Sequence, residues 1–97
     1  MKIRDKVILE TKAWAEEMRQ LDKELFSRLS QMHQPNILWV CSADSLVPIR
    51  EVTNTDPGEI LVHRNVANQV KPDDKNLMAV LEDALAISPL ELVVVCG

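Results

Sequence analysis

The sequence predicts an α/β fold: a small parallel β-sheet flanked by helices and preceded by a long N-terminal helical segment. Two observations indicate this fold. The strand-length apolar runs are nearly continuous, which is typical of strands covered on both faces. Strands separated by a helix favour parallel pairing through crossovers. The 97 residues allow one domain, 1–97, with a core of limited size.

The first third of the chain has the apolar period of a helix with one buried face. The residues that recur at this spacing are Trp14, Met18, Leu21, Leu25, Leu29 and Met32. An alternative is that Asp22 caps a second, short helix in which Glu24 and Arg28 form an i,i+4 pair. The pattern leaves open whether this segment is one helix or two that bend near residue 22.

Three strands are predicted after the breaker Gln34-Pro35-Asn36, at 37–41, 60–64 and 90–96. Turn chemistry in residues 55–58 precedes the second strand, because proline presets φ there and glycine accepts positive φ. A helix capped by Asp73 or Asp74 and ending before Pro89 separates the second and third strands. Its predicted inward residues are Leu77, Val80, Leu81, Ala84 and Leu85.

Charge and hydropathy exclude several classes of function. The formal charge is −4 and the basic residues are scattered, which argues against a nucleic-acid surface. No run approaches the roughly 20 apolar residues of a membrane span, and charges interrupt the N-terminal apolar runs, unlike a signal peptide. A cytoplasmic protein is therefore expected, with Cys41 and Cys96 as free, packed thiols. The small core favours association with a partner or with a second copy of the chain.

Polar residues follow each predicted strand, at 41–45, 63–65 and 96–97. Ligands of parallel sheets bind outside the carboxyl ends of the strands, where these clusters converge. A carboxylate (Asp44) near hydroxyls, an imidazole (His63), a guanidinium (Arg64) and an amide (Asn65) suits binding of a small anion or proton transfer. The alternative is structural: Asp44 and Ser45 cap a turn, Arg64 pairs with an acid, and His63 makes its hydrogen bonds within the fold.

The chain resembles the β-class carbonic anhydrases. The resemblance rests on the runs ILWVCSADS from Ile37, Val47-Pro48, Asp56-Pro57-Gly58-Glu59 and the distinctive HRNVAN at 63–68, and it extends from the Trp14 helix to Cys96-Gly97. It implies the α/β fold of that family, dimers with N-terminal helices lying across the neighbouring subunit, and, for Trp39 and Arg64, a second pocket that binds bicarbonate in some members.

The departures from the family pattern concern its zinc site. Where the family has Gly-Cys-Ser-Asp-Ser-Arg-Val-Pro, residues 41–48 read Cys-Ser-Ala-Asp-Ser-Leu-Val-Pro. Ser42 therefore replaces the cysteine ligand, and Leu46 replaces the arginine that partners the aspartate. By resemblance the other two ligands follow Cys96-Gly97 directly, where the sequence ends. A hydroxyl is a poor zinc ligand, and a site rebuilt around Cys41 is disfavoured because Cys41 faces opposite to Ser42.

We therefore expect a truncated, zinc-deficient homologue with no cofactor, and two hypotheses remain. The first is a metal-independent lyase that adds or removes water, with Asp44 as acid or base and a small anionic or carboxylate ligand. Its expected site is catalytic Asp44, Ser42, Ser45 and His63 with ligand-binding Trp39, Arg64, Asn65 and Cys41. The second is a non-catalytic remnant that dimerises or binds a partner. The sequence also leaves open that the polypeptide is a fragment.

Overall fold

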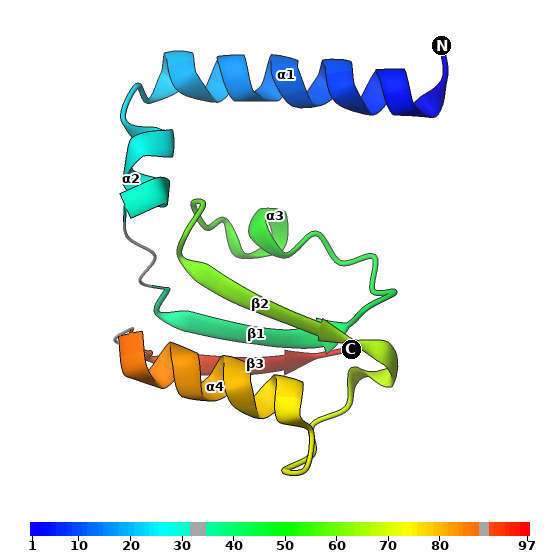
Figure 1. The fold of residues 1–97 in the computed structure, drawn as a ribbon, viewed down its shortest axis with the longest axis vertical. Helices are drawn as coiled ribbons and strands as arrows, with labels where there is room; N and C mark the ends of the chain where they lie inside the picture. Colours follow the sequence, from blue (N-terminus) through cyan, green and yellow to red (C-terminus); the bar gives the residue numbers. More distant parts are fainter. Residues whose placement is uncertain (32–34, 88–89) are drawn as a thin grey trace. The chain divides into compact units, whose positions relative to one another are not determined.

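The computed structural model describes residues 1–31, 35–87 and 90–97, and the chain divides into two compact units, Met1–Met32 and His33–Gly97. The first unit holds helices α1 (Ile3–Leu21) and α2 (Leu25–Gln31). The second holds strands β1 (Ile37–Ser42), β2 (Ile60–Asn65) and β3 (Leu92–Cys96), helices α3 (Ile49–Thr53) and α4 (Lys75–Ile87), and the 3₁₀ turn η1 (Val66–Asn68) (Figure 1).

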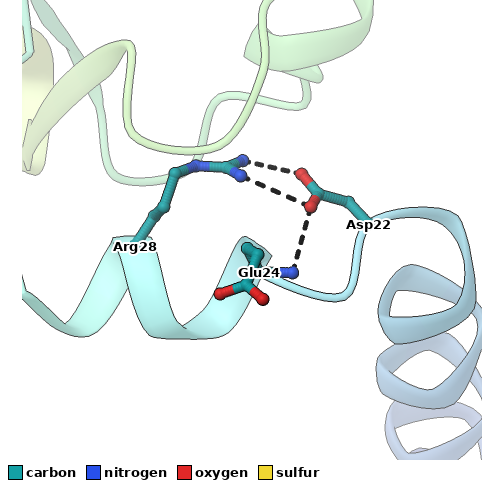
Figure 2. A network of polar contacts seen from close by, with 3 residues as sticks. All are labelled: Asp22, Glu24 and Arg28. Atoms are coloured by element: carbon teal, nitrogen blue, oxygen red, sulfur yellow. Dashed lines mark hydrogen bonds and ion pairs between the residues drawn. The ribbon is translucent and has the colours of Figure 1, made fainter.

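The break between α1 and α2 settles the alternative that the sequence left open, because there are two helices. Asp22 follows α1 with an extended backbone, and its Oδ1 accepts a hydrogen bond from the Glu24 N–H at 3.1 Å. The same carboxylate pairs with Arg28, with Nη2 2.7 Å from Oδ2 (Figure 2). The carboxylate of Glu24 is turned away from this guanidinium. Asp22, rather than Glu24, is therefore the ion-pair partner that the structure shows for Arg28.

The second unit is built on a three-stranded parallel sheet in the order β2-β1-β3. The central strand β1 is buried through its four middle residues, as its continuous apolar run predicts. The two outer strands are only partly covered. The parallel α/β fold is thus confirmed, with β3 beginning at Leu92 rather than at Leu90.

Each face of the sheet has its own apolar cluster. Leu38 and Val40 of β1 pack with Leu77 of α4 on one face. Trp39 and Cys41 pack with Ile49, the first residue of α3, on the other. Helices α3 and α4 lie on opposite sides of the sheet (Figure 1). The alternation along β1 follows from the two-residue period of a strand. At the end of β1, Cys41 therefore lies on the face of Trp39, and Ser42 lies on the face of Val40.

Helix α4 forms where its cap and apolar spacing predict it. Asp74, rather than Asp73, is the cap: its Oδ1 accepts from the N–H groups of Asn76 and Leu77 at 3.0 and 3.2 Å. Leu77 and Ala84 are buried, but Leu85 is 62% exposed, so its predicted inward position is wrong. In the described part of the chain, no helix has the length and apolar character needed to cross a membrane.

Candidate functional site

The loop after β1 meets the ends of both neighbouring strands. The Ala43 N–H donates to the carbonyl oxygen of Asn65 at 2.7 Å, next to the end of β2. The Ser45 hydroxyl donates to the carbonyl oxygen of Gly97 at 3.2 Å, beyond the end of β3. The predicted convergence of the three polar clusters is therefore seen in the structure. It arises because parallel strands end at one edge of the sheet.

A hydroxyl and a carboxylate form a close pair in this loop. Ser42 Oγ donates to Asp44 Oδ1 at 2.5 Å. The pair lies on the wall of an open cavity of about 360 Å³ lined by Ser42, Ala43, Asp44, Val66 and Ala67. Asp44 is exposed rather than buried, so both solvent and a small ligand reach its carboxylate. This carboxylate is the one acid–base group among the residues that line the cavity.

The far wall of the cavity comes from η1, which the sequence reading did not identify as part of the site. Ala67 and Asn68 have positive φ values of 68° and 48°, which turn the chain sharply after β2. Asn65 holds this turn: its Oδ1 accepts from the Gln69 N–H at 2.6 Å, and its Nδ2 donates to the Gln69 carbonyl at 2.8 Å. The only signal in the sequence was the position of Val66 and Ala67 directly after a strand.

Arg64 supports the loop from the other side of the sheet. Its Nη1 donates to the carbonyl oxygens of Ser42 and Ser45 at 3.0 and 3.3 Å. The expected pairing of Arg64 with an acid is replaced by these carbonyl contacts among the described residues. The guanidinium therefore fixes the loop that carries Asp44 and places a positive charge beside it.

The eight predicted site residues divide between the two faces of the sheet. Ser42, His63 and Asn65 share one face, and His63 Nε2 lies 3.4 Å from Asn65 Nδ2. Trp39, Cys41 and Arg64 share the other. Asp44 and Ser45 lie in the loop between the strands. One pocket therefore does not gather all eight, and only Ser42 and Asp44 line the cavity.

The face of Trp39 has an unused hydrogen-bond donor. The indole ring is 9% exposed, and its Nε1 is buried without a hydrogen-bond partner in residues 1–31, 35–87 and 90–97. Val62 is the register partner of Trp39, and Arg64 comes two residues later on the same face. A buried N–H and a guanidinium on one face are donors of the type that bind a small anion.

The donors needed for zinc do not come together in the described part of the chain. No group of three or more His, Cys, Asp and Glu residues there has the spacing to hold a metal ion. Ser42 stands in the register of the family's first cysteine ligand, while Cys41 packs on the opposite face with Trp39 and Ile49. A neutral hydroxyl beside a carboxylate does not fit the thiolate and imidazole set of a zinc site.

The family model and the similar sequences all point to one family. Residues 37–97 match the family model described as carbonic anhydrase. A carbonic anhydrase of Emericella nidulans is 36% identical over 93 residues, which are 96% of this chain and 41% of that protein. One of Candida albicans is 34% identical over 74 residues, 76% of this chain and 26% of that protein.

Solved structures agree with the sequence comparison. A tetrameric β-carbonic anhydrase of Sordaria macrospora superposes with a TM-score of 0.88 at 34% identity, covering 96% of this chain and 47% of that one. The β-carbonic anhydrase CafA of Aspergillus fumigatus gives a TM-score of 0.90 at 32% identity, covering 99% and 46%. The chain spans less than half the length of these relatives. Its sequence and its fold show that it belongs to the β-carbonic anhydrase family.

Proposed function

We propose that this chain is a metal-independent lyase of the carbonic anhydrase family, in which Asp44 transfers a proton to or from a small ligand in the cavity. The observation that carries this proposal is the Ser42–Asp44 pair, 2.5 Å apart on the cavity wall. A carboxylate within hydrogen-bond reach of a bound molecule is able to act as general acid or base. The serine hydroxyl holds one carboxylate oxygen and leaves the other for the ligand or for water.

The reaction class that suits this pair is the addition or removal of water. In the addition, Asp44 removes a proton from a water molecule while the oxygen of that water bonds to one carbon of a conjugated double bond. The neighbouring carbon then takes up a proton, so that the atoms of one water molecule are added. The apolar side chains of Val66 and Ala67 suit the carbon skeleton of a small ligand. His63 and Ser45 remain supporting residues in this proposal, because they do not line the cavity.

The catalytic proposal is tested with Asp44→Asn, which keeps the shape of the side chain and removes the base. Fumarate, acrylate and crotonate serve as probes, because hydration removes the ultraviolet absorbance of the conjugated double bond. We expect turnover by the wild type and a loss of at least about 100-fold in Asp44→Asn, the usual contribution of a general base. Asp73→Asn, an exposed carboxylate outside the cavity, is the matched control.

Three results would count against a metal-independent lyase. The first is full activity of Asp44→Asn, and the second is no turnover of any probe by the wild type. The third is stoichiometric zinc in the purified protein together with hydration of carbon dioxide. Elemental analysis and a carbon dioxide hydration assay, each with and without added zinc, distinguish these cases.

The opposite face of the sheet suits a separate anion site, distinct from the cavity beside Asp44. Trp39 Nε1 supplies a buried, unused N–H, and Arg64 supplies a guanidinium on the same face. Bicarbonate titration followed by Trp39 fluorescence, in a Trp14→Phe background, should give a saturable change. Arg64→Gln should abolish this change, whereas Arg50→Gln, an exposed arginine of α3, should leave it intact. An unchanged response in Arg64→Gln would exclude Arg64 from the anion site.

A second candidate function, association with another copy of the chain, is favoured by β3. This strand pairs with β1 along one edge only, and Leu92, Val93 and Val95 are 52%, 48% and 55% exposed. An apolar edge strand is a ready surface for association, and the Sordaria macrospora relative is described as tetrameric. Sedimentation velocity should show a dimer that Val95→Lys weakens, whereas Leu85→Lys, at an exposed position on α4, should leave it unchanged. A monomer at every concentration would rule out self-association.

A further inference from the structure

Two free cysteines stand opposite each other on neighbouring strands. Cys41 of β1 and Cys96 of β3 are register partners in the parallel sheet. Register partners project their side chains to the same face. Cys96 packs against the cluster that contains Cys41, together with Trp39 and Ile49. The two thiols are therefore neighbours in space although 54 residues separate them in the chain.

The spacing of the two strands allows a covalent bond between these thiols. Adjacent strands lie about 4.7–4.9 Å apart in the hydrogen-bonding direction. Disulfides join Cα atoms that are about 4.4–6.8 Å apart. Cys96 is the last residue of β3 and Cys41 is the last but one of β1, so the pair lies near the end of the sheet, where small backbone adjustments are easier than in its middle.

The two thiols differ in their access to solvent. Cys41 is 1% exposed, enclosed by the central strand and its neighbours. Cys96 is partly exposed on an edge strand. A small reagent in solution therefore reaches Cys96 first, and Cys41 only through Cys96.

We propose that Cys41 and Cys96 are a redox-reactive dithiol that a low-molecular-weight disulfide, such as glutathione disulfide, converts into a cross-strand disulfide. The Cys96 thiolate attacks one sulfur of the reagent, whose S–S bond breaks and releases one thiolate. The Cys41 thiolate then attacks Cys96 Sγ and releases the second reagent thiolate. The protein loses two electrons and two protons, and the reagent gains them as two thiols. This site is independent of Asp44 and of the proposed lyase chemistry.

The test uses the 97-residue chain, reduced and then incubated with glutathione disulfide under native conditions. We expect both free thiols to disappear and the intact mass to fall by two hydrogens. Tryptic digestion without reduction should then join the peptide 29–50 to the peptide 76–97, since neither contains an internal lysine or arginine. A reducing agent should restore both free thiols.

Single-cysteine variants separate the two steps. Cys41→Ala should stop at a mixed disulfide on Cys96, with the mass raised by one glutathione. Cys96→Ala should leave the Cys41 thiol unmodified until the protein is unfolded in denaturant, which also shows that the variant is folded beforehand. The proposal is overturned if wild-type Cys96 retains glutathione without release, if both thiols stay free, or if disulfide-linked dimers form instead.

Discussion

At the scale of single residues, Asp22 shows how one carboxylate fixes a break between two helices. It accepts the Glu24 N–H, ends α1 and pairs with Arg28 through both oxygens. Hydrogen bonding from Arg28 is the main reason that the pKa of Asp22 lies below its ordinary value of 3.8; burial acts in the opposite direction. Because the pKa is lowered in the folded chain, the interaction stabilises fully above pH 3.8 and is lost as the pH falls through the folded pKa.

The matching prediction concerns the pKa of Asp22. Arg28→Gln removes the charged donor, so the pKa of Asp22 should rise toward 3.8. Carboxyl carbon chemical shifts, followed by NMR from pH 2 to 6, measure it directly. Arg19→Gln is the control, because Arg19 pairs with Glu16 within α1. An Asp22 pKa that does not change in Arg28→Gln would contradict this assignment.

The sequence revealed parts of the candidate site unevenly, for reasons that individual residues make clear. The continuous apolar run predicts Ser42 and Asp44 at the end of a strand, and in the structure both line the cavity at the end of β1. Strand alternation predicts that Cys41 and Ser42 lie on opposite faces of the sheet. The same alternation separates the other site residues on the strands. Asn65 was expected to bind a ligand, yet it holds Gln69. That contact lies at a turn with positive φ at Ala67 and Asn68. The sequence has no glycine or turn motif there from which this turn could be predicted.

At the scale of elements, helix α4 was predictable and α3 was not. The sequence of α4 combines an aspartate cap with apolar residues four and three positions apart at Leu77, Leu81 and Ala84. Helix α3 has five residues, including β-branched Ile49, Val52 and Thr53, and its cap position is Pro48, which has no side-chain hydrogen bond. Leu85 departs from the prediction, since it is 62% exposed while Leu77 and Ala84 of the same helix are buried.

The cap of α4 gives the second prediction. Asp74→Ala removes the acceptor of two N–H groups, and the free energy of unfolding should fall by about 0.5–2 kcal/mol. Asp73→Ala changes the adjacent, exposed carboxylate and should alter stability by less than about 0.5 kcal/mol. Urea unfolding followed by circular dichroism measures both. Equal losses in the two variants would show that Asp74 has no special role as the cap.

The buried face of α4 gives the third prediction. Leu77 is 3% exposed and packs on Leu38 and Val40, so Leu77→Ala should lower the free energy of unfolding by about 2–5 kcal/mol. Leu85→Ala removes the same atoms from a side chain that is 62% exposed. It should change stability by less than about 0.5 kcal/mol. Urea titrations measure the free energy of unfolding of both variants. A larger loss in Leu85→Ala than in Leu77→Ala would show that the face of α4 with Leu85, and not the face with Leu77, packs on the sheet.

At the scale of the whole chain, the sheet unit and the helical unit differ in what they bury. Both apolar clusters around β1 consist of residues from the second unit. Helix α1, in contrast, contains no buried residue. A unit with its own core is expected to fold by itself. The family relationship rests mainly on this second unit, since the matched family model begins at Ile37.

The last prediction is that residues 33–97 fold without residues 1–32. The shortened chain should unfold cooperatively in urea, with a smaller dependence on denaturant because less surface is exposed on unfolding. Trp39 is then the single tryptophan, so its fluorescence reports the sheet. Full-length Trp14→Phe carries the same fluorophore and is the matched reference. Coincident transitions by fluorescence and circular dichroism would establish an independent unit. A gradual, non-cooperative change would mean that residues 33–97 do not fold cooperatively by themselves.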